Sequence, residues 1–432
     1  MGPRRLMAEY SNYSSWLNEM RSRAWSIYQS TPTPTTKSEE WRYTDLSKLF
    51  PLENISLEMN PEASTKRPTK EGLTETINTA GRVQFTDGLV TNIQLTPEME
   101  SQGVGLDSLQ HTTHEKHQEI IKTNLSSHVL PPESGKFQAL NAALWTDGII
   151  IYVPKNVHVE MPIRGKHQLD SRNPSVCTRT LIIAEEGSHV SYVEEFGSDD
   201  FDDKHIVSSA VEIIAHKNAT VDFVSVQNLG RGIFFQNAQK SLVHRDASVN
   251  TLNVNLGASL SRLDLNTQLI EPGANSKMLG LYFGDEDQHF DHNTSQDHLA
   301  PHTGSDLLYK GALDGHSRAA FRGIIRVHSE AQQTDAYQTN RTLLLSEHAR
   351  ADSLPNLEIE ADDVRCSHGS TVGQLDPEAI FYLLSRGFSQ QQAERLVVLG
   401  FLGDVMARLP RGAFKRVVKN VTDAVEQKLR HG

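Results

Sequence analysis

The stretch Gly148–Ile163 reads GIIIYVPKNVHVEMPI, in which apolar and polar residues alternate in short runs. Three later stretches have the same texture and are rich in Val, Ile and Thr. Alternation with a period of two predicts strands, because successive side chains of a strand point to opposite faces. The later stretches are TLIIAEEGSHVSYVEEF at 180–196, AVEIIAHKNATVDFVSV at 210–226 and ASVNTLNVNLGASLSRLDL at 247–265.

Turn-forming residues separate these runs at similar intervals. Each of the turns Lys217-Asn218-Ala219, Arg245-Asp246-Ala247 and Pro272-Gly273-Ala274 ends in alanine, so the alanines follow one another after 28 and 27 residues. A stack of coils needs a tight corner at the same place in every coil, so this weak repeat favours a parallel β-helix. A β-sandwich also consists of short strands and turns, and it remains the alternative fold.

Helical patterns precede the β-rich region. Residues 13–28 carry apolar side chains at steps of three and four, which predicts a helix that ends before Thr31-Pro-Thr-Pro34. Residues 55–80 are polar and predict a loosely structured connection. Residues 82–95 predict a strand pair, and residues 107–136 predict a helix followed by a linker.

Three further helices are expected at the end of the chain. Asp376 suits the N-cap of the first and Ser389 the N-cap of the second, while Pro410 suits the first turn of the last. The sequence therefore predicts a mainly β protein with three parts. These are an N-terminal domain with helices at 1–135, a parallel β-helix core at 136–372 and a C-terminal helical domain at 373–432.

Composition and charge exclude several classes of protein. The 432 residues carry 42 basic and 54 acidic side chains, and this net charge of −12 would repel a phosphate backbone, so nucleic-acid binding is not expected. No apolar run is long enough to cross a membrane. The start, MGPRRLMAEYSNYSSW, lacks the apolar run of a secretory signal, so we expect a cytoplasmic protein.

Several catalytic signatures are absent from the sequence. It contains no G-x-x-x-x-G-K-[ST] loop for ATP phosphates, no G-x-S-x-G nucleophile elbow and no H-E-x-x-H zinc motif. We therefore do not expect an enzyme. Two alternatives remain open: a polysaccharide-active enzyme with a β-helix groove, and a pure interaction module without ligand residues.

Four blocks of sequence resemble the SufB/SufD family of iron–sulfur cluster assembly proteins. They occur in the expected order over nearly the whole chain: EEWRYT at 39–44, QHFDHNTSQDH at 288–298, ADDVRCSHGSTVGQLD at 361–376 and IFYLLSRG at 380–387. SufB-like chains carry a cysteine in a segment that reads TNRTLL here, at 339–344. Arg341 stands in its place, so the resemblance is closest to SufD.

The resemblance implies a fold, partners and a cargo. The fold would be a right-handed parallel β-helix between an N-terminal domain with helices and a C-terminal helical domain. A SufB-like subunit would pair with the β-helix, and a SufC-like ATPase would bind the C-terminal helices. The iron–sulfur cluster would be transient and shared with the partner, and no nucleotide would bind this chain itself.

Cys366 and His368 are the leading candidate cluster ligands. The chain has two cysteines, Cys177 and Cys366, whereas a cluster commonly needs four thiolates, so any cluster here must be shared or have mixed ligands. Residues two apart on a strand face the same side. The resemblance implies a role for His368 in cluster formation at the SufB-like interface. Alternatively, Cys366 is a small buried apolar residue and His368 a hydrogen-bonded edge histidine.

Residues 285–302 form a second candidate site, because they are dense in Asp and His. His289, Asp291 and His298 are the candidate metal ligands in this segment. The alternative is a hydrogen-bonded or subunit-interface segment. Cys177 lies in an alternating stretch and is expected in the core, and Trp41 and Tyr43 are expected to pack in a local apolar patch rather than against a partner.

Overall fold

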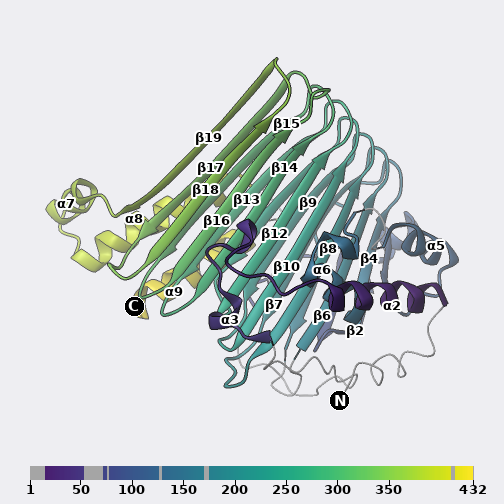
Figure 1. The fold of residues 1–432 in the computed structure, drawn as a ribbon, viewed down its shortest axis with the longest axis horizontal. Coiled ribbons are helices and arrows are strands. Elements are labelled where there is room, and N and C mark those ends of the chain that lie inside the picture. Colours follow the sequence, from purple (N-terminus) through teal and green to yellow (C-terminus); the bar gives the residue numbers. More distant parts are fainter. Residues whose placement is uncertain are drawn as a thin grey trace.

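The computed structural model describes residues 15–52, 72–74, 77–125, 129–169, 175–409 and 414–431. Two stacked sheets dominate these residues (Figure 1). The ten-stranded sheet contains β1 (Gly81–Thr86), β2 (Leu89–Leu95), β5 (Ile163–Gln168), β7 (His189–Gly197), β9 (Thr220–Asn228), β11 (Ser248–Asn255), β13 (Asn275–Gly284), β15 (Gly304–Leu313), β17 (Thr334–Leu344) and β19 (Val364–Gln374). The nine-stranded sheet contains β3 (Gly105–Ser108), β4 (Asp147–Val153), β6 (Ser175–Ala184), β8 (His205–Ala215), β10 (Ile233–Val243), β12 (Leu260–Leu269), β14 (His289–His298), β16 (Arg318–Val327) and β18 (Arg350–Ile359).

The strands from β4 to β19 form a parallel β-helix. The chain alternates between the sheets, so each coil contributes one strand to each, and all pairings within this series are parallel. The predicted β-helix is confirmed, and the β-sandwich alternative is wrong. The predicted strand pair at 82–95 is the antiparallel β1–β2 hairpin, whose first strand also pairs in parallel with β5.

The weak alanine repeat marks one corner of successive coils. Ala219, Ala247 and Ala274 are each fully buried. The residue before each alanine has a positive φ: 58° at Asn218, 54° at Asp246 and 78° at Gly273. Asn, Asp and Gly tolerate this left-handed conformation best, and the tight corner leaves room inside only for a small side chain.

The side chains inside the β-helix become more polar from the first coils to the later ones. The first coils are filled by aliphatic and aromatic side chains, which include Ile149, Ile182 and Phe223. Buried polar groups become frequent in the later coils, where Gln239 donates to Asn253 at 2.6 Å. Cys177 is buried as expected, and burial raises the pKa of its thiol to about 12, so this cysteine belongs to the core.

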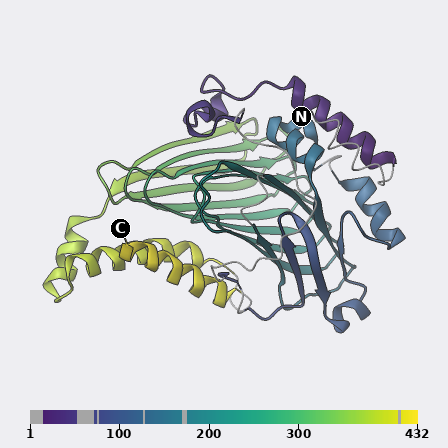
Figure 2. The ribbon, with the colours of Figure 1, turned by 90° about the horizontal axis from the view of Figure 1, so that it is seen from below.

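The N-terminal helices lie on the outer face of the nine-stranded sheet (Figure 2). Helix α2 packs against α6, which the sequence analysis missed because it assigned the residues from 136 onward to the β-helix core. Arg21 of α2 donates to the carbonyl of Trp145 at 2.8 Å. The helices of this region are α2 (Ser15–Ser30), η1 (Glu39–Trp41), α3 (Leu46–Leu49), α4 (Pro97–Ser101), α5 (Glu115–Asn124), η3 (Pro132–Ser134) and α6 (Lys136–Leu144). Most of the predicted connection at 55–80 lies outside the described residues.

The C-terminal helices α7 (Pro377–Ser385), α8 (Gln390–Met406) and α9 (Lys415–His431) follow β19. Asp376 and Ser389 cap α7 and α8 as predicted, and Ser389 forms a full capping box with Gln392. Helices α8 and α9 cover the outer face of the ten-stranded sheet, opposite the N-terminal helices (Figure 2). No helix in the described part of the chain is long and apolar enough to span a membrane. The division of the chain at residues 135 and 372 stays a prediction.

Candidate functional site

The β-helix is open at its last coil. β19 pairs only with β17, and β18 pairs only with β16, so each of these two strands ends its sheet. Their outer backbone N–H and C=O groups therefore have no partner strand within the described residues. Unpaired strand edges of this length are ready to pair with another chain.

Cys366 and His368 both belong to this last coil. In the β17–β19 pairing, Cys366 lies beside Ala336 and His368 beside Gln338, and both neighbours are buried inside the β-helix. The two candidate ligands are therefore on the inner face of β19, as their spacing predicted. His368 is exposed and Cys366 is half-buried, because no further coil covers them.

The inner face of β18, in the same last coil, carries apolar side chains that are also left exposed. Leu357 and Ile359 remain 36% and 40% exposed, although the residues beside them in β16 are fully buried. Burial raises the pKa of the Cys366 thiol, and the negative charge of Asp335 adds to this effect. Cys366 is therefore mainly a thiol in the isolated chain at neutral pH, and its conversion to a thiolate needs a metal or a cation nearby.

Two donors are too few to hold a cluster. No group of three or more His, Cys, Asp or Glu side chains that could bind a metal ion occurs among the described residues. An iron–sulfur cluster at the open end would therefore need additional ligands from a second chain.

His289 and Asp291 lie elsewhere, on the outer face of β14. Both are buried beneath the N-terminal segment, where Thr44 donates to Asp291 at 2.5 Å and lies 2.9 Å from His289 Nε2. Arg262 also donates to Asp291 at 2.6 Å. Burial lowers the pKa of His289, so its imidazole is neutral here. These side chains attach the N-terminal segment to the sheet.

His298 does not join this pair. It is nine residues further along β14, which corresponds to about 30 Å, and it faces the inside of the β-helix. Its ring nitrogens lie 2.7 Å from the Thr303 hydroxyl and 2.8 Å from the Ser305 hydroxyl. The expected combination of His289, Asp291 and His298 in one metal site is therefore not formed, and the hydrogen-bonded alternative describes these residues better.

The N-terminal block Glu39–Thr44 forms part of the same attachment. Trp41 is buried, its ring lies 5.4 Å from that of Phe137, and the guanidinium of Arg262 stacks over it at 3.8 Å. Trp41 therefore packs locally, as expected, whereas Tyr43 is half-exposed.

The exposed face of the C-terminal helices is a second candidate interface. Helix α7 extends beyond the open end of the β-helix (Figure 1). Its side chains are unusually apolar for an exposed surface, which is typical of a binding site. The large exposed apolar residues of α7 and α8 and of the turn between them are Phe381 (72%), Tyr382 (57%), Leu384 (38%), Phe388 (41%) and Leu396 (41%).

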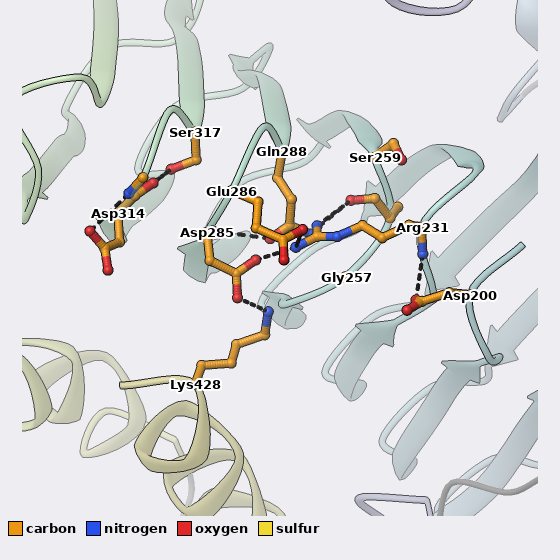
Figure 3. A network of polar contacts seen from close by, with 12 residues as sticks. Asp200, Arg231, Gly257, Ser259, Asp285, Glu286, Gln288, Asp314, Ser317 and Lys428 are labelled. Atoms are coloured by element: carbon orange, nitrogen blue, oxygen red, sulfur yellow. Dashed lines mark hydrogen bonds and ion pairs between the residues drawn. The ribbon is translucent and has the colours of Figure 1, made fainter. Parts of the chain in front are cut away.

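An ion-pair network fastens α9 to the corners of the β-helix (Figure 3). Lys428 donates to Asp285 at 2.8 Å, and Arg231 binds the other oxygen of the same carboxylate. Arg231 also lies 3.1 Å from Glu286, and its backbone N–H donates to Asp200 at 2.8 Å. Although burial opposes the charge of Asp285, Lys428 and Arg231 lower its pKa, so the carboxylate stays ionised.

We expect replacement of Asp285 by Ala to loosen α9. The change leaves the partly buried ammonium of Lys428 without its carboxylate, and the cost should be about 1–2 kcal/mol because solvent screens part of the interaction. Hydrogen exchange of residues 415–431 should become faster. Asp306→Ala is the matched control, because its ion pair with Arg408 is more exposed and should contribute less than about 1 kcal/mol. Unchanged exchange in Asp285→Ala would show that apolar packing alone holds the helix.

Two family models match the chain and together cover most of it. Residues 167–401 match the core domain of the SUF system for iron–sulfur cluster assembly, described as the SufBD core domain. Residues 5–164 match the N-terminal region of SufBD proteins. The chain belongs to the SufB/SufD family.

Relatives from staphylococci extend this SufB/SufD match over nearly the full length. An iron–sulfur cluster assembly SufBD family protein of Staphylococcus haemolyticus is 29% identical over 409 residues, which cover 91% of this chain and 86% of the relative. Homologues of the same description from Staphylococcus saprophyticus and Staphylococcus aureus are 28% and 27% identical and cover 94% of this chain. This SufB/SufD chain is thus an iron–sulfur cluster assembly family protein.

Sequence reasoning missed two parts of the candidate site in this SufB/SufD chain. The first is the apolar inner face of β18, although the alternation in Ser353-Leu-Pro-Asn-Leu-Glu-Ile359 contained the signal. The second is the attachment of α9 through Asp285, which a sequence cannot reveal because its partners Arg231 and Lys428 lie 54 and 143 residues away.

Proposed function

We propose that this chain is a SufD-like, non-ATPase scaffold subunit of a cytoplasmic iron–sulfur cluster assembly complex. The observation that carries the proposal is the open last coil, which combines two unpaired strand edges, an exposed apolar inner face on β18, and His368 and Cys366 on β19. In this proposal a SufB-like subunit covers that coil, a SufC-like ATPase binds the C-terminal helices, and the nascent cluster forms at the subunit boundary.

Strand pairing with the SufB-like subunit is better suited to β19 than to β18. β18 contains Pro355 at its centre, which lacks a backbone N–H and interrupts the row of donors. β19 has eleven residues without a proline, so its backbone groups can pair along the whole edge. The edge that carries His368 is therefore the one proposed to lie directly against the partner.

The docking of a SufC-like ATPase is supported by the apolar surface of α7 and α8. A cavity of about 390 Å³ lies between this surface and the end of β17, and Leu344, Ile380 and Phe381 are among the residues that line it. The helices that would bind the ATPase are thus continuous with the last coils, and α9 is fastened to the β13–β14 corner. Dimerisation of the bound ATPase on ATP would therefore strain the subunit boundary.

The donor set at the open end fits a shared cluster rather than a resident one. His368 can provide an imidazole nitrogen as a ligand, and Cys366 can provide a thiolate once iron lowers its pKa. The remaining ligands would come from the SufB-like partner. Mixed ligation of this kind agrees with a cluster that is assembled and then passed on.

The first experiment is the replacement of His368 by Ala. We expect the complex with both partners to form normally and the yield of cluster on anaerobic reconstitution to fall at least tenfold, because one ligand is lost at an exposed position that contributes little to folding. The yield is measured from the visible absorbance and the Mössbauer signal of the reconstituted complex.

His158→Ala is the matched control for this experiment, because His158 is also exposed but lies in the first coils, far from the open end. It should leave both assembly and cluster yield unchanged. A normal cluster yield in His368→Ala would show that His368 is not a cluster ligand. The chain would then be a pure interaction module. Loss of the complex itself would instead assign His368 a structural role at the boundary.

A further inference from the structure

A cavity of about 250 Å³ lies on the opposite side of the molecule from the C-terminal helices. Its floor is the outer face of the nine-stranded sheet, formed by strands β10, β12, β14 and β16. Its walls are the segment Pro34–Trp41 and the residues that lead into α6. The cavity is therefore at the junction of the N-terminal region with the β-helix, and it shares no lining residue with β18, β19 or α7.

Lys240 of β10 is the distinctive residue of this cavity. Its side chain is half-buried, yet no group in the described part of the chain forms a hydrogen bond or an ion pair with its ammonium. The carboxylates that act on its charge are those of Asp297 and Glu212, which are already bound to His328 and Arg179. Burial lowers the pKa of Lys240, and the charges of Asp297 and Glu212 only partly oppose this effect.

Two other cations of the cavity have unused donors. Arg322 binds Glu39 through one terminal nitrogen at 3.1 Å, but its buried Nε has no partner among the described residues. The ammonium of Lys136 binds only uncharged groups, the carbonyls of Tyr28 and Thr31. Both side chains line the cavity together with Lys240, so a ligand in it could accept hydrogen bonds from several elements at once.

The negative charges of the cavity are mostly engaged. Asp264 accepts hydrogen bonds from Arg262 at 2.8 Å and from Gln138 at 3.3 Å. Arg262 is itself matched by Asp264 and Asp291, so it adds no free charge. The carboxylate of Glu40 is exposed at the rim. Among the described residues, the charges left without a bonded counterpart inside the cavity are thus the ammonium groups of Lys136 and Lys240.

We propose that this cavity binds a small molecule through a phosphate group, with Lys240 as its main ligand. A phosphate offers several acceptor oxygens to donors that converge from different elements, and it would match two ammonium groups in charge. The volume is sufficient for a compact phosphate monoester and too small for a bulky ligand. The site differs from the proposed cluster site in place and in chemistry.

Phosphate binding at this position would also fasten the N-terminal region to the β-helix. The lining residues come from three separate segments of the chain, so a ligand that contacts all three stabilises their arrangement. A ligand that binds only the folded state raises the unfolding temperature, and the increase grows with ligand concentration.

The test uses the full chain with inorganic phosphate and glycerol phosphate as probes, and acetate at equal ionic strength. We expect both phosphates to bind by isothermal titration calorimetry and to raise the unfolding temperature, whereas acetate should do neither. Lys240→Gln should weaken phosphate binding at least tenfold. Lys277→Gln, which removes an exposed lysine of the ten-stranded sheet, is the matched control and should bind phosphate as the wild type does.

Arg322→Gln provides a second variant in case Lys240→Gln folds poorly, and it should weaken phosphate binding at least threefold. The proposal is overturned if the wild-type chain binds neither phosphate. It is also overturned if folded Lys240→Gln and Arg322→Gln chains bind phosphate with wild-type affinity, because the anion then binds elsewhere. Cluster yield in the His368→Ala experiment does not enter these outcomes, so the two proposals can fail separately.

Discussion

The double substitution Leu357→Arg and Ile359→Arg should abolish pairing of this chain with a SufB-like partner while the chain itself stays folded. Both side chains face the inner side of β18 and are 36% and 40% exposed. They contribute little to the isolated chain and would become fully buried only beneath a partner. The loss of their remaining apolar contact would weaken pairing by about 1–2 kcal/mol in total.

The introduced charges should outweigh that apolar loss. Two guanidinium groups forced into an apolar boundary without carboxylates cost several kcal/mol, since each must lose its water. We therefore expect the dissociation constant of the pair to rise more than about 100-fold, equivalent to about 3 kcal/mol. Size-exclusion chromatography and surface plasmon resonance with the partner measure this change.

The matched control for this experiment is Met161→Arg with Leu299→Arg. These residues are 44% and 37% exposed, close to the values of the first pair, but neither belongs to the last coil. Pairing should be unaffected in the control. Normal pairing in the Leu357→Arg and Ile359→Arg variant would show that the partner does not cover the open coil, and the proposed site of cluster formation would have to be abandoned.

Local patterns predicted the β-helix because its determinants are local. Alternation in runs such as residues 210–226 is a property of neighbouring residues, and the tight corners need Asn, Asp or Gly followed by a small residue. The caps of α7 and α8 are also local, and both were correctly predicted from Asp376 and Ser389. Helix α6 was missed: its residues were assigned to the β-helix core, and the helix has no capping side chain that marks its start.

The candidate site was predicted only in part, because chain pairing is not a local property. The spacing of Cys366 and His368 correctly placed them on one strand face, but it could not reveal that this face is the uncovered end of the β-helix. The density of Asp and His at 285–302 suggested a metal site, because closeness in the sequence does not show which side chains meet in space. A strand places alternate residues on opposite faces, and His298 follows His289 by nine positions, an odd offset, so the two side chains are separated by the strand itself as well as by distance.

The contacts of Thr44 join residues that are far apart in the sequence, so they could not be predicted from it. Its hydroxyl binds both His289 and Asp291, which lie 245 and 247 residues further along the chain. The family block Glu39–Thr44 therefore has a structural role in this chain, which is to hold the N-terminal segment on the β-helix. The same attachment forms one wall of the cavity in which we propose phosphate binding.

Arg262→Met should be the most destabilising single substitution considered for this chain. The side chain of Arg262 is 1% exposed and donates to Asp291 at 2.6 Å, to Asp264 at 2.8 Å and to the carbonyl of Glu40 at 2.9 Å. Although burial disfavours its charge, Asp264 and Asp291 raise the pKa of Arg262, so the guanidinium is always charged. Methionine fills a similar volume but leaves Asp291 buried without a cation.

The expected cost of Arg262→Met is about 3–5 kcal/mol, the usual penalty for removal of one partner of a buried ion pair. The penalty should appear as a lower urea midpoint and as faster proteolysis within residues 31–50, since Trp41 also loses the guanidinium that covers it. Arg326→Met is the matched control on the same sheet. Its ion pair with Glu358 is exposed on both sides and should contribute at most about 1 kcal/mol.

A double variant separates the two explanations of such a loss. If the unpaired carboxylate is responsible, Arg262→Met combined with Asp291→Leu should recover much of the stability, because no buried charge remains. If the loss of packing on Trp41 is responsible, the double variant should be no more stable than Arg262→Met alone. A urea midpoint of Arg262→Met equal to that of the wild type would contradict both explanations and would mean that the N-terminal segment does not depend on this network.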